Sequence, residues 1–240
     1  SLGITFDRFY ANPMCTPTRR SLIQSRWSQD DLSGVCDGND DEDHGGYAMG
    51  KALEVVGYET AWFGKWHYGG NTVGAWEITP HLYGFESVRA MLPANVRQCG
   101  GTDYFTWTRG DDWVSGIFVG YNTDTTVEAV EQWLVEPRGP APRFAVVSLQ
   151  APHAPFHEPP AFPLPQLPPP TNRDKYEAML MDADRALGLV MDALTPQDWI
   201  VLIGDNGTPP SARRPDQSSS KVKFSVFEDG VNVPCVLSGP

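Results

Sequence analysis

A short apolar run at residues 143–149 decides the fold class: Arg143-Phe144-Ala145-Val146-Val147-Ser148-Leu149. Its apolar residues follow one another without alternating with polar ones, which is typical of a strand buried on both faces of a parallel sheet. Three more runs have this character, and they span 60–63, 198–203 and 231–237. The sequence therefore predicts four short strands in a parallel sheet.

Segments with the period of an α-helix alternate with these strands. The longest spans 174–194, where one face stays apolar through Tyr176, Met179, Leu180, Ala183, Leu187, Val190, Met191 and Leu194. Shorter predicted helices span 16–27, 47–56 and 125–134. The alternation predicts a layered α/β fold with one domain over residues 1–240. Within it, residues 159–171 are predicted to form a loop, because seven prolines exclude a helix or a central strand.

The composition limits the classes of function. The chain has 240 residues, of which 18 are basic and 30 acidic. The resulting net charge of −12 argues against nucleic acid as a partner, because phosphates bind basic surfaces. The apolar runs are far shorter than the roughly 20 residues that a membrane-spanning helix needs, so no membrane span is predicted. Any anion bound by this chain must therefore meet a local cluster of cations.

One pentapeptide places a nucleophile beside a predicted helix terminus: Cys15-Thr16-Pro17-Thr18-Arg19. Thr16 is predicted to cap the helix and Pro17 to take its first position, which leaves Cys15 next to free backbone N–H groups. This end of a helix favours a bound anion or a thiolate, and the planar fork of Arg19 suits a tetrahedral oxyanion. Two alternatives stay open: a buried cysteine beside a surface arginine, or a disulfide between Cys15 and Cys36.

The same pentapeptide resembles the maturation signature of the type I sulfatases, whose cysteine is oxidised to formylglycine. Four further motifs resemble those of this family and follow in its order: Gly64-Lys65-Trp66-His67-Tyr68-Gly69, Ala151-Pro152-His153-Ala154-Pro155-Phe156, Gly204-Asp205-Asn206-Gly207, and Lys223 five residues before Glu228-Asp229-Gly230-Val231-Asn232-Val233-Pro234. The resemblance extends over essentially all of the chain.

The resemblance implies a fold and an activity. The fold would be the alkaline-phosphatase-like three-layer α/β/α sandwich with a mostly parallel central sheet. The activity would be hydrolysis of a sulfate monoester, on a small molecule or a glycan, with Ca²⁺ or Mg²⁺ as cofactor. A formylglycine-generating or equivalent maturation enzyme would first modify the cysteine. In this family one hydroxyl of the hydrated aldehyde attacks sulfur and the second hydroxyl later expels the sulfate.

The resemblance also implies roles for the residues near the nucleophile. Cys15 would be the precursor of the nucleophile and a metal contact. Asp205 and Asn206 would supply oxygen ligands to the metal ion. Arg19 would steady the hydrated aldehyde.

The remaining motif residues would handle the sulfate group. Lys65, His153 and Lys223 would bind its oxygens, because cationic groups stabilise the charge that develops in the transition state. His153 or Lys223 would donate a proton to the leaving oxygen. His67 would be the base in the step that releases sulfate.

The sequence also departs from the family pattern. The family begins with a strand that ends in two aspartates, and it continues into a C-terminal subdomain. Neither is found between Ser1 and Pro240, so the fold is expected to be incomplete at both ends and the activity impaired. Asp229 replaces the first glycine of the last motif. Two alternative functions stay open: a phosphonate monoester or phosphodiester hydrolase of the same superfamily, and a non-catalytic relic that binds anions.

Overall fold

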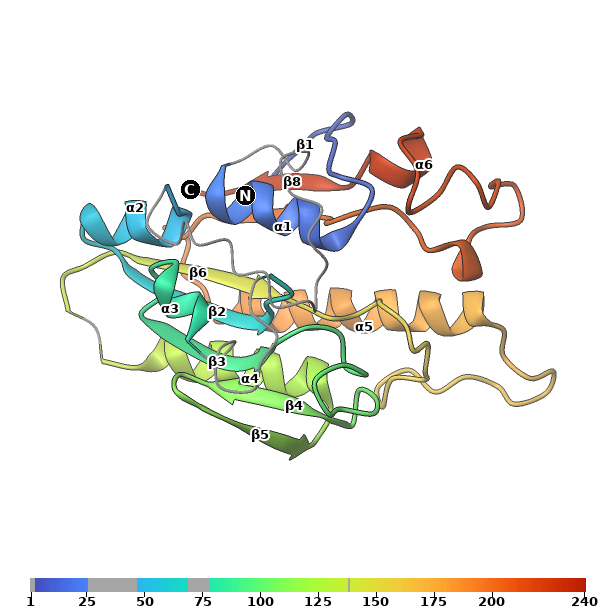
Figure 1. Cartoon of the computed structure of the whole chain (residues 1–240), viewed down its shortest axis with the longest axis horizontal. Helices are drawn as coiled ribbons and strands as arrows, with labels where there is room; N and C mark the ends of the chain where they lie inside the picture. Colours follow the sequence, from blue (N-terminus) through green and yellow to red (C-terminus); the bar gives the residue numbers. More distant parts are fainter. Residues whose placement is uncertain (1–2, 26–46, 69–77, 138) are drawn as a thin grey trace.

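The computed structural model describes residues 3–25, 47–68, 78–137 and 139–240 (Figure 1). Cys36 lies outside these residues, and Cys15, its partner in the predicted disulfide alternative, is a free cysteine in the structure. Within the described ranges no helix has the length and apolar character needed to cross a membrane.

The larger of two sheets carries the predicted parallel core. Its five strands lie in the order β5-β4-β3-β2-β6. Strand β2 pairs in parallel with β3 on one side and with β6 on the other, whereas β4 is antiparallel to both of its neighbours, β3 and β5. The strands span Glu59–Lys65 (β2), Ser87–Leu92 (β3), Thr106–Asp111 (β4), Val114–Val119 (β5) and Arg143–Ser148 (β6).

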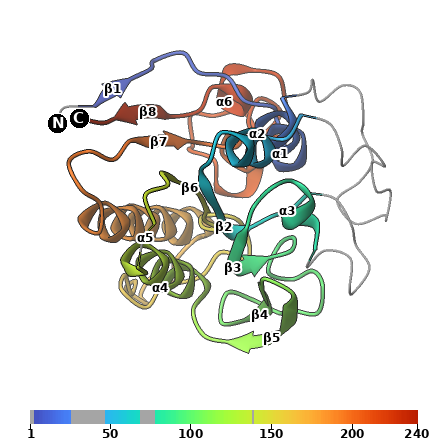
Figure 2. The same cartoon turned by 90° about the vertical axis from the view of Figure 1, so that its left-hand side faces the viewer.

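Helices cover both faces of this sheet, as the end-on view shows (Figure 2). One face carries α4 (Asn122–Val135) and α5 (Asn172–Asp192). The opposite face carries α1 (Cys15–Gln24), α2 (Met49–Val55) and α3 (Thr79–Leu82). The predicted three-layer α/β/α architecture is therefore confirmed.

Strand β2 supplies both apolar cores, because successive side chains point to opposite faces of a sheet. Phe63 packs in the core shared with α4 and α5, which includes Trp133 and Met179. Trp62 packs on the other face, where it meets Trp66 edge to face at 4.7 Å between ring centroids. All four of the predicted helices are present, with ends shifted by a few residues. Helix α5 begins earlier than predicted, because Thr171 and Asp174 form a capping box at its start.

The parallel pairing predicted for residues 198–203 and 231–237 is wrong. Strands β7 (Ile200–Ile203) and β8 (Cys235–Ser238) pair antiparallel and form a separate sheet with β1 (Ile4–Thr5), in the order β1-β8-β7. Strand β8 begins beside the end of β7, with Cys235 opposite Ile203, so the two strands run in opposite directions. The side chains are not buried on both faces either, since Val201 is 63% exposed.

Candidate active site

Cys15 is the first residue of α1, and its side chain is buried. The residue before the helix is Met14, which has extended backbone and makes no side-chain cap, so the predicted capping role of Thr16 is wrong. The thiol donates to Asn206 Oδ1 at 3.1 Å. Its sulfur accepts a hydrogen bond from Lys223 Nζ at 3.3 Å. The reactive atom therefore sits between one acceptor and one cationic donor that come from distant parts of the chain.

Arg19 lies one turn further along α1 and is also buried. Its Nη1 donates to the Lys65 carbonyl and to Ser148 Oγ, each at 2.7 Å. Its Nη2 lies 3.3 Å from Asp205 Oδ2. One planar guanidinium thus joins α1 to the ends of β2 and β6 and to the loop after β7.

Lys65 and His67 lie at the carboxyl end of β2, and one amide connects them. Lys65 Nζ donates to Asn95 Oδ1 at 2.8 Å, and Asn95 Nδ2 lies 3.3 Å from His67 Nε2. Gln98 Oε1 accepts from both the backbone N–H and the side-chain amide of Asn95, at 2.9 Å each. This fixes the orientation of the Asn95 amide, with its oxygen toward Lys65.

A glycine just before Lys65 makes this strand end possible. Gly64 has a φ of 76°, a conformation that side chains disfavour, and a Cβ there would lie 2.2 Å from the Ser148 carbonyl oxygen. The pairing of β2 with β3 shifts between Phe63 and Lys65. The irregularity lies directly before Lys65, at the edge where the carboxyl ends of parallel strands form ligand sites.

His153 follows β6 and reaches the same site. Its Nδ1 lies 2.8 Å from the carbonyl of Ala154, and its own backbone carbonyl accepts from Tyr104 Oη at 2.7 Å. Burial has the largest effect on the pKa of its ring, and the nearby charges of Lys65, Lys223 and Asp205 also act on it. His153 therefore faces the other site residues without a direct hydrogen bond to them among the described residues.

The loop after β7 packs tightly on the segment that carries Lys223. A Cβ at Gly207 would lie 2.0 Å from the Asp229 carbonyl oxygen, and Gly207 N donates to the Gly230 carbonyl at 2.9 Å. Thr18 Oγ1 donates to the Asp205 carbonyl at 2.7 Å. These contacts hold the Asp205 loop between α1 and helix α6 (Glu228–Val231).

The electrostatics of the site favour an anion. Arg19, Lys65 and Lys223 are 7%, 2% and 7% exposed, and the one ion pair that they form in the described structure is that of Arg19 with Asp205. Burial lowers the pKa of Lys65 to about 8, and Arg19 adds to the effect. Burial raises the pKa of Asp205, but the three cations outweigh this and hold it below its usual value.

Both histidines of the site are neutral near pH 7. Burial and then the charge of Lys65 hold the pKa of His67 well below its usual value. The same two causes lower the pKa of His153 to about 3. At neutral pH the two rings therefore add no positive charge to the site, and each has one ring nitrogen that can accept a proton.

The residues present do not complete a site for a divalent cation. Ca²⁺ takes six to eight oxygen ligands, and Mg²⁺ takes six. Asp205 and Asn206 offer two oxygen-bearing side chains, and among the described residues no cluster of three or more His, Cys, Asp or Glu side chains could hold a metal. Asp205 is also engaged by Arg19. Asp205, Asn206 and Cys15 are therefore too few to hold a Ca²⁺ or Mg²⁺ ion by themselves.

Three residues of the site were not predicted from the sequence. Asn95 links Lys65 to His67, Ser148 accepts from Arg19, and Thr18 holds the Asp205 loop. Asn95 and Ser148 lie at or just beyond the ends of strands, where α/β sheets form ligand sites. All eight residues predicted for the site do lie together: Cys15, Arg19, Lys65, His67, His153, Asp205, Asn206 and Lys223.

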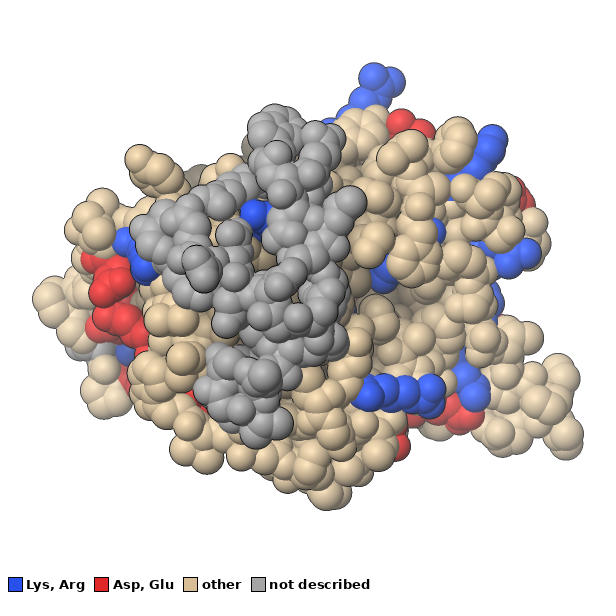
Figure 3. Space-filling model, viewed as in Figure 1, with Lys and Arg blue, Asp and Glu red and all other residues tan. Residues whose placement is uncertain are grey.

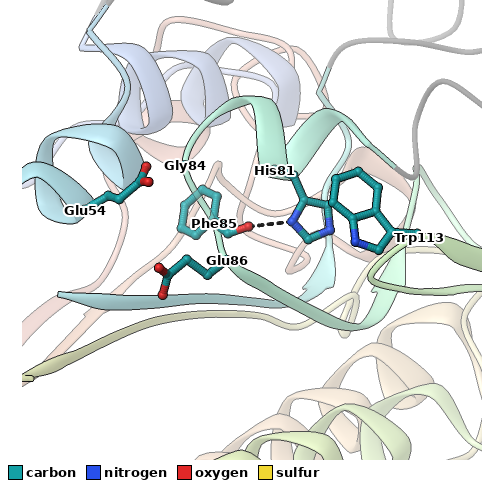
Figure 4. Close-up of a pocket in the computed structure, with 6 residues that line it drawn as sticks. All are labelled: Glu54, His81, Gly84, Phe85, Glu86 and Trp113. Atoms are coloured by element: carbon teal, nitrogen blue, oxygen red, sulfur yellow. Dashed lines mark hydrogen bonds between the residues drawn. The ribbon is translucent and has the colours of Figure 1, made fainter. Parts of the chain in front are cut away.

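The surface is hollowed between the segment 206–227 and helix α5, and Lys and Arg atoms border this hollow (Figure 3). A different pocket of about 310 Å³ lies at the opposite, amino end of β2 and β3 (Figure 4). There His81 stacks on Trp113 at 4.1 Å between ring centroids, and its Nδ1 lies 2.7 Å from the Phe85 carbonyl. No residue of the predicted site lines that second pocket.

Comparison with known proteins identifies the family of the chain. The whole chain, residues 1–240, matches the family model described as Sulfatase. The chain therefore belongs to the sulfatase family. It is 25% identical over 274 aligned residues to arylsulfatase J of Mus musculus, an alignment that covers 99% of this chain and 42% of that protein. The chain spans about half the length of the curated relatives it matches.

Solved structures share the fold. The structure of "Ps i-CgsB in complex with k-i-k-neocarrahexaose" has a TM-score of 0.81 at 21% identity, covering 99% of this chain and 58% of that one. The structure of "BT4656 in complex with its substrate D-Glucosamine-2-N, 6-O-disulfate" has a TM-score of 0.70 at 16% identity, covering 99% and 64%. The predicted alkaline-phosphatase-like fold is thereby confirmed.

Proposed function

We propose that this chain carries the catalytic residues of a sulfuric ester hydrolase. The observation that carries the proposal is the convergence of buried Arg19, Lys65 and Lys223 around Cys15 in a protein of net charge −12. Burying three cations beside one carboxylate costs free energy of folding unless an anion binds among them. A tetrahedral sulfate, with four oxygens, fits this need.

Cys15 is the precursor of the nucleophile in this proposal. Converted to formylglycine by a maturation enzyme, the residue supplies a hydrated aldehyde with two hydroxyls. The donor Lys223 and the acceptor Asn206 already hold the group at this position from two sides. Arg19 stands one helical turn away and contributes positive charge to the same wall of the site.

The other side chains bind the sulfate group and move protons. Lys65 and Lys223 meet its negative oxygens, and neutral His153 binds a further oxygen. Lys223 or His153 then gives a proton to the leaving alkoxide oxygen. Lys223 gives it as an ammonium, whereas His153, with a pKa of about 3, first has to take up a proton. Asn95 Nδ2 donates to His67 Nε2, so the neutral ring carries its proton on Nδ1, which is buried without a partner in the described structure. As the base that releases sulfate, His67 would accept a proton either on Nε2, once that 3.3 Å contact is lost, or on Nδ1 in the other tautomer.

The metal ligands remain part of the proposal. Asp205, Asn206 and the group derived from Cys15 are the oxygen donors that would face a Ca²⁺ or Mg²⁺ ion. They fall short of a full ligand set, so further oxygens would have to join them.

A sugar sulfate is the substrate class that we favour. The BT4656 structure holds a glucosamine disulfate described as its substrate, and this chain shares its fold. A glycan or small-molecule sulfate ester is therefore proposed as the partner of this chain.

A comparison of two esters tests the proposed function. We expect 4-nitrophenyl sulfate to be hydrolysed faster than a 4-nitrophenyl phosphonate monoester, with release of nitrophenol as the measurement and with Ca²⁺ or Mg²⁺ titrated in. The Lys223→Met variant should lose the activity, because it removes the cation at the reactive atom. A preference for the phosphonate would favour the alternative hydrolase. Sulfate binding without turnover in matured protein would favour the non-catalytic relic.

The affinity for inorganic sulfate should fall as the pH rises from about 7 to about 9.5. Lys65 has a pKa of about 8, so it loses its charge within this range and attracts the anion less. The expected fall approaches tenfold per pH unit above about pH 8, because one proton is coupled to binding. Calorimetry in a Cys15→Ala background checks this without interference from the thiol.

The matched control is Lys65→Met in the same background. It should bind sulfate weakly at pH 7 and show no further loss at high pH. Equal pH profiles for the two proteins would contradict the assignment.

The stability of the fold should change with pH in the opposite direction to sulfate binding. The pKa of Lys65 in the folded protein lies below the ordinary value of 10.5, so the neutral lysine favours the fold. The free energy of unfolding should therefore rise between about pH 8 and 10.5.

A further inference from the structure

Phe224 adopts an unusual backbone conformation beside the site. Its φ is 77°, a region where glycine is favoured and a bulky side chain is rare. Its ring is nevertheless 65% exposed, so packing in the core does not explain it. A strained residue that the surroundings hold in place is a common feature of ligand sites.

The backbone of Phe224 is fixed from two sides. Its N–H donates to the Pro13 carbonyl at 3.0 Å, and the N–H of Lys223 donates to the Thr208 carbonyl at 3.0 Å. Pro13 precedes the nucleophile by two residues, and Thr208 follows the Asp205 loop. The strained conformation is therefore imposed by the same two segments that build the site.

The side chain of Lys223 lies between the Phe224 ring and the Cys15 sulfur. Lys223 Nζ is 5.6 Å from the centroid of the Phe224 ring and 3.3 Å from Cys15 Sγ. Because Cys15 is buried, the organic part of an ester bound at Lys223 has to extend toward solvent. Phe224 borders Lys223 and is 65% exposed, whereas Cys15 is 5% exposed, so the ring is the more accessible neighbour of Lys223.

We propose that Phe224 is the residue that binds the ring of the substrate: an aryl group or a pyranose whose sulfate is held by Lys223. This rests on the proposed function. Either ring offers an apolar face that a phenyl ring can cover. Phe227, on the same segment, is a different case: the lysine over its ring is the exposed Lys221, whereas the lysine over the Phe224 ring is Lys223, which contacts Cys15.

Calorimetry in the Cys15→Ala background tests the proposal, because no turnover disturbs the binding measurement. The probes are inorganic sulfate, ethyl sulfate, 4-nitrophenyl sulfate and galactose 6-sulfate. We expect a ring-bearing sulfate to bind about tenfold more tightly than ethyl sulfate, which is the scale of a ring–ring contact with its buried area. Phe224→Leu should remove this advantage and leave the affinity for ethyl sulfate and inorganic sulfate unchanged.

Two further variants make the outcome clear. Phe224→Gly relieves the backbone strain, so it should fold at least as stably and still lose the advantage of the ring. Phe227→Leu should still bind ring-bearing sulfates more tightly than ethyl sulfate. Equal losses in the two leucine variants, or no loss in Phe224→Leu, would overturn the inference while sulfate binding persists.

The affinities of the different probes show which kind of ring Phe224 binds. An advantage for the nitrophenyl ester alone assigns an aryl group, and an advantage for the galactose ester assigns a sugar; both support a ring-binding role. Failure of inorganic sulfate to bind at all would instead overturn the proposed function, and the inference with it.

Discussion

The Cys15→Ala variant is expected to hydrolyse 4-nitrophenyl sulfate at least about 10³-fold more slowly than the matured parent protein, since it lacks the nucleophile. The fold should survive, because alanine fits the first turn of α1 and the thiol makes two hydrogen bonds, to Asn206 and Lys223. The loss of these bonds should lower the free energy of unfolding by about 1–2 kcal/mol. Nitrophenol release and thermal unfolding are the two measurements.

Two controls connect this loss to the chemistry of residue 15. Mass spectrometry of the peptide that contains Cys15 should show a mass lower by roughly 18 Da in active protein, as formylglycine requires. Cys15→Ser offers a single hydroxyl, so it should accept a sulfo group once, gain roughly 80 Da and stop, because nothing remains to expel the sulfate. Full activity of the alanine variant, or of protein with an unmodified thiol, would contradict the proposed role of Cys15.

The layered fold could be predicted because its signals are local. The uninterrupted apolar runs at 60–63 and 143–149 correspond to β2 and β6, and the amphipathic segment at 174–194 corresponds to α5. The pairing direction of two strands is not a local property. The runs at 198–203 and 231–237 are equally apolar, yet the strands in them, β7 and β8, pair antiparallel. Strand β3 was not recognised because Arg89 interrupts its apolar run, although the structure satisfies that charge with Glu136.

The candidate site shows the same division. Cys15, Lys65, His153 and Lys223 belong to motifs with fixed spacing, so their meeting could be predicted from the resemblance. Asn95 belongs to no motif. It follows β3, a strand that was not predicted, so its contact with Lys65 could not be predicted either. Its orientation depends on Gln98, a contact that only the folded chain creates.

The Arg19→Ala variant is expected to lose about 3 kcal/mol of unfolding free energy, which corresponds to a thermal midpoint lower by about 10 °C. Arg19 is buried and joins three elements through the Lys65 carbonyl, Ser148 and Asp205. Its removal leaves two acceptors unpaired and the Asp205 carboxylate without its guanidinium. Denaturant unfolding gives the free energy. Turnover should also fall, because one of the three buried cations is gone.

A surface arginine provides the matched control for this prediction. Arg214 pairs with Asp216 at 3.3 Å, both side chains are more than half exposed, and Arg214→Ala should change stability by less than about 0.5 kcal/mol. The double variant Arg19→Ala/Asp205→Ala should be more stable than the sum of the two single changes predicts, since it also removes the unpaired carboxylate. Strict additivity of the two changes would show that the guanidinium and the carboxylate do not interact. It would then remove the main structural reason for placing Asp205 beside the cations of the site.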